Sequence, residues 1–180
     1  MKKRILTWLL AISMLGSLLT VPAGAAAVTK FSDVSDSYTA TAVETLRLMG
    51  VLDGYGDGTF RPDTVLNRAQ FCKMAVYAMD GSGELGRYST VTIFPDVKPS
   101  HWASAYINMA ARKGIISGFA DGKFKPGQTV TAGQAVTILM RGLGYKDEDM
   151  GGVWPQSYMA EAQTNGLLKS TGITSAYAGL

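Results

Sequence analysis

The chain has 180 residues, with 17 Lys and Arg against 14 Asp and Glu, and a single cysteine, Cys72. One cysteine excludes an intramolecular disulfide, and we expect a buried, unreactive thiol at this position. Three of the basic residues, Lys2, Lys3 and Arg4, belong to a segment that export would remove, which leaves 14 charges of each sign. A neutral chain without clustered Lys and Arg excludes a nucleic-acid or anionic-membrane partner.

Residues 1–27 are typical of a secretory signal peptide. The basic residues precede an apolar run, Ile5–Leu19, and small residues follow at 23–27. The run is shorter than the roughly 20 residues that a membrane-spanning helix needs. We therefore expect cleavage after Ala25 or Ala27, and an exported chain with no membrane segment after cleavage.

A connector sequence occurs twice, at 50–70 and at 114–134, with a constant offset of 64 residues. Glycine, proline and turn aspartates that recur in register indicate a recurring backbone path, because these residues are selected for their dihedral angles. The chain is therefore predicted to be a repeat protein. The identical pairs are Gly50/Gly114, Gly54/Gly118, Asp57/Asp121, Gly58/Gly122, Phe60/Phe124, Pro62/Pro126 and Gln70/Gln134.

Further repeated sequence segments divide the chain into three units. The sequence at Phe31–Val34 recurs at Phe94–Val97, and Tyr38, Trp102 and Trp154 each stand twelve residues before a glycine. We expect a first repeat at 28–81, a Gly/Ser-containing linker at 82–93, a second repeat at 94–146 and a partial third repeat at 147–180.

The third unit ends about where its second helix would begin. We expect the chain to be a fragment of a longer protein, because the stripe of Tyr158, Met159 and Ala162 would otherwise be partly exposed. A degenerate third unit is the alternative.

Each unit is predicted to be a helix, a connector and a second helix, which gives an all-α fold. In the first helix the apolar stripe is Ala42, Val43, Leu46 and Met49, and Gly50 is expected to end it. The second helices are expected to begin after Asn67 and Thr131, each followed three residues later by a glutamine as in a capping box. Their expected buried faces comprise Phe71, Met74, Ala75 and Ala78 in the first unit, and Ala135, Ile138, Leu139 and Leu143 in the second.

The connector does not match a calcium loop. Counting from Asp53, Tyr55 and Thr64 stand at the third and twelfth positions, where an EF-hand needs oxygen ligands and a bidentate Glu. His101 is the only histidine, and it lies at a helix entry with no acid or nucleophile independent of the repeat motifs to partner it. We therefore predict no active site, no metal and no cofactor, and expect that the chain is not an enzyme.

Arg68 occupies the first position of a predicted helix, where the helix dipole already presents partial positive charge. A cation there is unfavourable by roughly 0.3–1 kcal/mol, so folding does not require it. An anion lying between the guanidinium and the helix end would explain it. An exposed arginine that covers Tyr55 or Phe60 is the alternative.

The two long motifs, FSDV…GVLDGYGDGTFRPDTVLNRAQ and FPDV…HWA…GIISGFADGKFKPGQTVTAGQ, resemble S-layer homology domains over essentially the whole mature chain. That family shows an F-x-D-V opening, a Trp-led helix, G-I-x-x-G-Y-x-D-G-x-F-x-P and a T-R-A-E-like helix start. The resemblance implies three repeats in a pseudo-threefold helical bundle with grooves between neighbours. It also implies non-covalent anchoring of an exported protein to the cell wall through secondary wall polysaccharide, often pyruvylated.

The resemblance also places the candidate carbohydrate-binding residues. Arg68 matches the family's helix-start arginine, whereas Ala132 in the second unit departs from it, which suggests a mainly structural repeat. Tyr38 replaces the usual tryptophan, and for Tyr38, Trp102 and Trp154 we expect core packing, with stacking on sugar rings as the alternative. The candidate residues are Arg68, Asn67, Gln70, Tyr38, Trp102, Gly54 and Asp57.

Two other functions stay open beside the leading hypothesis. The repeats could tether a wall-associated enzyme whose catalytic domain lies beyond Leu180. Alternatively, the chain could be a self-assembling structural protein of a surface layer, with copies of itself as partners.

Overall fold

The computed structural model describes residues 30–79, 82–169 and 171–180, and all regular elements within these ranges are helices. The predicted all-α class is therefore confirmed, and the predicted signal peptide lies outside the described residues. None of the described helices is both long and apolar enough to cross a membrane. The elements are α2 (Ser37–Leu48), α3 (Arg68–Ala78), η1 (Ser82–Tyr88), α4 (Ser104–Arg112), α5 (Ala132–Gly142), η2 (Asp147–Asp149) and α6 (Gln156–Thr164), where η marks a 3-10 helix.

The predicted helix ends are confirmed where local sequence determines them. The Asn67 side chain accepts a hydrogen bond from the Gln70 backbone N–H at 2.9 Å, and the Gln70 side-chain oxygen accepts one from the Asn67 backbone N–H, which completes the capping box. Thr131 caps α5 in the same way, but the side chain of Gln134 makes no hydrogen bond back to the Thr131 backbone, so this capping box is incomplete. Gly50 follows the end of α2 with a φ of 73°, a left-handed conformation that glycine adopts without strain.

Parts of the predicted apolar stripes are wrong. In α2 the buried residues are Ala40 and Val43, whereas Ala42 and Met49 are exposed. Ala78 at the end of α3 and Leu143, which follows the end of α5, are exposed, and in α5 Val136 and Met140 are buried in addition to the predicted Ala135 and Ile138. The reason is that α5 contacts helices on two sides, α3 and α6, so a single stripe does not describe it.

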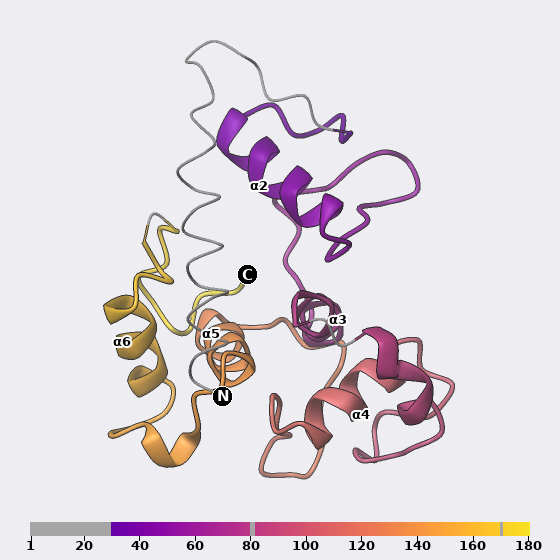
Figure 1. Ribbon diagram of the computed structural model, residues 1–180, viewed down its shortest axis with the longest axis vertical. Coiled ribbons are helices and arrows are strands. Elements are labelled where there is room, and N and C mark those ends of the chain that lie inside the picture. Colours follow the sequence, from indigo (N-terminus) through magenta and orange to yellow (C-terminus); the bar gives the residue numbers. More distant parts are fainter. Residues whose placement is uncertain (1–29, 80–81, 170) are drawn as a thin grey trace.

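The first helix of a unit packs against the second helix of the preceding unit. Figure 1 shows α3 and α5 nearly end-on at the centre, with α2, α4 and α6 placed around them, and the contacts join α4 to α3 and α6 to α5. Consequently Tyr158 and Ala162 are buried against Val136 and Met140 of α5. The expectation that the third stripe would be partly exposed is therefore wrong for Tyr158 and Ala162, because their partner comes from the second unit, whereas Met159 is only partly buried.

The segment predicted as a linker is folded and packs on the second unit. It contains η1, which packs on α4, and Leu85 and Tyr88 contact the core cluster. The buried Asn108 side chain donates to the backbone oxygens of Tyr88 and Val91. The repeat boundaries themselves stay predictions.

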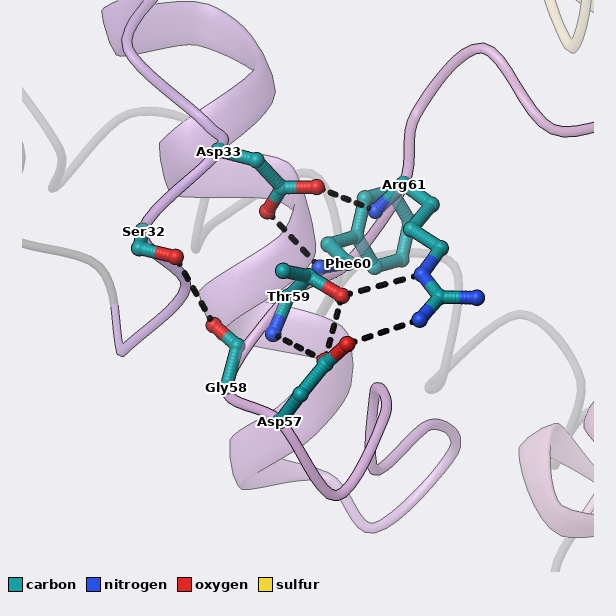
Figure 2. A network of polar contacts seen from close by, with 7 residues as sticks. All are labelled: Ser32, Asp33, Asp57, Gly58, Thr59, Phe60 and Arg61. Atoms are coloured by element: carbon teal, nitrogen blue, oxygen red, sulfur yellow. Dashed lines mark hydrogen bonds and ion pairs between the residues drawn. The ribbon is translucent and has the colours of Figure 1, made fainter.

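The F-x-D-V motif holds the connector of its own unit in place. Asp33 accepts hydrogen bonds from the backbone N–H groups of Phe60 at 2.8 Å and Arg61 at 2.6 Å, as Figure 2 shows. Arg61 has a φ of 62°, a conformation that costs roughly 1–2 kcal/mol for a residue with a side chain. The two hydrogen bonds offset that cost, and Asp96 makes the same pair to Phe124 and Lys125.

Three backbone positions, one from each unit, close a ring of hydrogen bonds. The N–H of Val130 donates to the oxygen of Leu66, that of Leu66 to Leu180, and that of Leu180 to Val130. A cyclic pattern of this kind is what three equivalent units around a common axis would make. The complete pseudo-threefold bundle stays a prediction.

Candidate functional site

The N-terminus of α3 is covered, contrary to the expectation that an anion would lie against it. The backbone N–H of Arg68 donates to the oxygen of Gln128 at 2.9 Å, and that of Ala69 donates to the oxygen of Pro126 at 3.0 Å. Both acceptors belong to the connector of the second unit. The helix end therefore has no free N–H at these two positions to offer a ligand.

The Arg68 side chain also lies against the second unit. Only 5% of Arg68 is exposed, and the guanidinium lies about equally far from the rings of Phe119 and Phe124, at 4.6 and 4.5 Å from their centroids. The alternative of an exposed arginine over Tyr55 or Phe60 is therefore wrong. The rings that Arg68 contacts are the equivalents of those two residues in the next repeat.

All three hydrogen bonds of this guanidinium go to neutral oxygens. Nε donates to the backbone oxygen of Phe124 at 2.8 Å, Nη1 to the side-chain oxygen of Gln134 at 3.1 Å, and Nη2 to the backbone oxygen of Ser117 at 3.4 Å. The bond to Gln134 explains why that side chain does not complete the capping box of α5.

Arg68 carries a buried charge that no carboxylate in the described part of the chain neutralises. Among the described residues no Asp or Glu forms an ion pair with it. Burial lowers the pKa of Arg68, and the more distant Asp96 only partly opposes this effect. An arginine remains protonated even so, because its ordinary pKa is above about 12. A buried cation of this kind is costly until an anion approaches it.

Arg68 lines a cavity of about 430 Å³, which we name the Arg68 groove. Its walls come from the second connector (116–120), from α5 and from the third unit. Two further charged residues, Arg141 and Asp147, line it, together with Trp154, which is 52% exposed.

Arg141 and Asp147 form a forked ion pair inside the Arg68 groove. Nε and Nη2 of Arg141 donate to the two carboxylate oxygens of Asp147 at 2.8 and 2.7 Å, and the Tyr158 hydroxyl donates to Asp147 as well. Burial lowers the pKa of Arg141, but the bonds to Asp147 and Tyr158 outweigh it and raise the pKa overall. The Arg141 and Tyr158 bonds together lower the pKa of Asp147, so the pair is ionised at neutral pH.

A second cavity of about 380 Å³, the Trp102 groove, lies at the equivalent place in the first unit. Leu180 lines it, and its cations are Lys73 and Arg61. Lys73 pairs with Asp53 at 3.4 Å, and Arg61 pairs with Asp57 at 2.7 Å. Residues at equivalent positions in the two grooves are Leu52/Ile116, Gly54/Gly118, Tyr55/Phe119, Gln70/Gln134, Met74/Ile138 and Trp102/Trp154.

The expectation that the repeated aromatic residues pack in the core is wrong. Tyr38, Trp102 and Trp154 are 70%, 57% and 52% exposed. Both tryptophans line a groove, and the indole N–H of Trp154 donates to Thr137 at 3.0 Å, which fixes the ring. A fixed, half-exposed indole ring offers a face on which a sugar ring could stack.

The seven predicted site residues do not come together in one place. Arg68 lines the Arg68 groove, whereas Gly54, Gln70 and Trp102 line the Trp102 groove. The other three line neither cavity: Asn67 caps α3, Asp57 binds Thr59 and Arg61, and Tyr38 lies at the exposed start of α2. Their role in binding stays a prediction.

The sequence reasoning missed Arg141, Asp147 and Tyr158. Comparison of the repeats draws attention to residues that recur, and the position equivalent to Arg141 is Tyr77. Asp147 is the first residue of the predicted third repeat and has no aspartate counterpart in the other two. An Arg and an Asp six residues apart at the end of a helix were the available signal.

The chain matches known proteins over most of its length. The family model described as the S-layer homology domain matches residues 30–72 and 93–136. A "Cell surface protein" of Thermoanaerobacter kivui is 38% identical over 87% of the chain, and a "Cellulosome-anchoring protein" of Acetivibrio thermocellus is 31% identical over 63% of it. An "Uncharacterized cell wall amidase" of Bacillus anthracis is 29% identical over 94% of the chain.

These relatives are much longer than the matched region. The chain spans 20%, 26% and 33% of the three proteins in the same order. The similarity therefore concerns a shared module, and the rest of each relative has no counterpart in the 180 residues.

Proposed function

Because the chain contains S-layer homology domains, we propose that it anchors an exported protein non-covalently to the cell wall by binding an acidic secondary wall polysaccharide in the Arg68 groove. Relatives named for the cell surface and for anchoring support the wall location. The observation that carries the proposal is the buried guanidinium of Arg68, which lines a cavity and has no carboxylate partner among the residues that the structure describes.

The arrangement suits an acidic sugar better than a neutral one. A ligand carboxylate next to Arg68 would add charge-assisted hydrogen bonds and neutralise a charge that is already desolvated. The exposed face of Trp154 lies in the same cavity and could cover the apolar face of a sugar ring. A pyruvyl ketal on the polysaccharide would supply both the carboxylate and the ring.

Arg68→Gln tests this assignment. It removes the charge but keeps a polar side chain, and we expect binding to purified wall polysaccharide to weaken by about 1.5–3 kcal/mol, roughly 10- to 150-fold. Isothermal titration calorimetry measures the affinity, and Arg112→Gln, at an exposed residue that lines neither groove, removes the same charge as a control. Equal affinities for both variants would remove Arg68 from the site.

A tether for a wall enzyme is a second candidate, favoured by the amidase-named relative, which the chain matches over 94% of its own length. In that case the 180 residues bind the wall and a further region of the protein carries the activity. The chain alone should then bind cell walls, and it should not release peptides from purified peptidoglycan by cleaving amide bonds. Product release by the chain itself would overturn the tether.

Self-association in a surface layer rests on a different observation. Three large apolar or aromatic side chains of the α2 region are exposed, Tyr38, Leu48 and Met49, at 63–72%. Exposed apolar area of this kind can mediate contacts between copies. Static light scattering over a concentration series should show a rising mean mass, and a constant monomer mass would contradict assembly through this region.

A further inference from the structure

The charged groups of the Arg68 groove suggest a finer selectivity, which rests on the proposed function. We infer that Asp147 restricts the Arg68 groove to sugars that bear a single negative charge, and so acts as a specificity-determining residue. The proposal assigns a role to a residue outside the repeat motifs.

The first step is the balance of charge. Three charged side chains line the groove: Arg68, Arg141 and Asp147. Two cations and one anion leave one positive charge for a ligand to neutralise.

The second step is which guanidinium remains available. Both carboxylate oxygens of Asp147 accept from Arg141, at 2.8 and 2.7 Å, and Nη1 of Arg141 donates to the Ser117 hydroxyl at 3.2 Å. The forked face of Arg141 is therefore occupied. Within the described residues, the guanidinium of Arg68 has neutral acceptors alone, and one of these three bonds is long, at 3.4 Å.

The third step is how firmly Asp147 is held. The Tyr158 hydroxyl donates to Asp147 Oδ1 at 2.5 Å, and Tyr158 is 2% exposed within the cluster that joins α5 and α6. A carboxylate fixed by both a guanidinium and a buried phenol cannot swing away at little cost. It stays in the groove when a ligand enters.

These contacts predict discrimination between one and two negative charges. A monoanion can neutralise Arg68 and leave the Arg141–Asp147 pair intact. A dianion brings a second charge that finds no further free cation among the described residues of the groove and is repelled by Asp147, because like charges placed together in an interface are strongly unfavourable. Without the Asp147 charge, Arg141 would become a second cationic contact, and dianions would gain most.

A purely structural role for Asp147 makes a different prediction. As a link between η2, α5 and α6 it would affect folding stability and lower the affinity for every ligand together. The ratio of affinities for mono- and dianionic sugars separates the two roles.

The experiment is a competition assay with the full chain and purified wall polysaccharide. The competitors are glucose carrying a 4,6-pyruvyl ketal, a monoanion, and glucose 6-phosphate, which carries close to two negative charges at about pH 8. For the unaltered chain we expect the ketal to displace polysaccharide at an at least tenfold lower concentration. In Asp147→Asn we expect that preference to shrink by about tenfold or to reverse.

Two further variants keep the result interpretable. Asp149→Asn removes the same charge two residues away, outside the groove lining, and should leave the preference unchanged. Tyr158→Phe keeps the buried ring, loosens Asp147 and should shift the preference in the same direction as Asp147→Asn by a smaller factor. The Tyr158→Phe variant therefore still tests the inference if Asp147→Asn does not fold.

The outcomes distinguish the inference from the proposed function. Suppose first that polysaccharide binding depends on Arg68. If the two competitors then act equally, if neither displaces polysaccharide, or if neither variant changes the preference, Asp147 does not set charge selectivity. In each of these cases only the inference is wrong. If the chain does not bind wall polysaccharide at all, the proposed function falls and the inference with it.

Discussion

Arg68 and Arg141 bring the same chemical group into one groove, and their surroundings give them different roles. Arg141 is neutralised by Asp147 within hydrogen-bonding distance, whereas Arg68 is 5% exposed and surrounded by neutral oxygens and two aromatic rings. The arginine without a carboxylate is therefore the one with charge to offer a ligand.

Asp96 gives a stability prediction at the residue scale. Its carboxylate accepts the backbone N–H groups of Phe124 and Lys125, and Lys125 has a φ of 58°. We expect Asp96→Asn to lower the free energy of unfolding by about 1–3 kcal/mol at pH 7, because asparagine offers one neutral oxygen in place of two charged ones and so leaves one backbone N–H without its acceptor. Urea denaturation measures this, with the exposed Asp63→Asn as a control that should change little.

The same carboxylate predicts how stability depends on pH. Burial raises the pKa of Asp96, but its backbone hydrogen bonds outweigh that effect and lower the pKa below its ordinary 3.8. A depressed pKa stabilises the fold above about pH 4, and this contribution is lost as the pH falls through the lower, folded value. The stability gap between the unaltered chain and Asp96→Asn should therefore close toward pH 2, and a gap that is constant from pH 7 to pH 2 would contradict the assignment.

At the element scale, the start of α5 is closely covered. A Cβ at Gly133 would lie 2.9 Å from Pro155 and 3.0 Å from the backbone oxygen of Ala176. Glycine in a helix is normally about 1 kcal/mol worse than alanine, so a packing requirement has overridden helix propensity here. The start of α5 is held between the approach to α6 and the last residues of the chain.

Gly133→Ala should therefore destabilise the fold by about 1–3 kcal/mol in spite of its better helix propensity. Gly86→Ala, in η1, meets no atom within 4 Å and serves as the control. Thermal unfolding followed by circular dichroism compares the two variants. A Gly133→Ala chain at least as stable as the original would show that α5 has room to move at this end.

The elements also show what the sequence could predict. Helix starts at Asn67 and Thr131 and stops such as Gly50 follow from contacts within a few residues, and these predictions are confirmed. The partners of Arg68 and Gln134 lie in different repeats, so local pattern could not reveal them. Trp102 lines a groove whose other residues come mostly from the first unit, and the prediction of core packing was wrong.

At the scale of the whole molecule, each unit is completed by its neighbour. The first helix of one unit covers the second helix of the unit before it, and the connector of the second unit covers the start of α3. The ring of hydrogen bonds through Leu66, Val130 and Leu180 lies where the three units meet. Grooves with equivalent positions follow from this arrangement, while their charges differ because residues such as Arg141 do not recur.

The central claim is that Arg68 recognises an acidic group of the wall polysaccharide. The most direct measurement is a two-by-two calorimetric comparison of the unaltered chain and Arg68→Gln with polysaccharide before and after chemical removal of its pyruvyl groups. The account predicts that removing either partner weakens binding about 10- to 150-fold and that removing both weakens it little further. Independent, additive losses, or equal affinity for both polysaccharides, would contradict it.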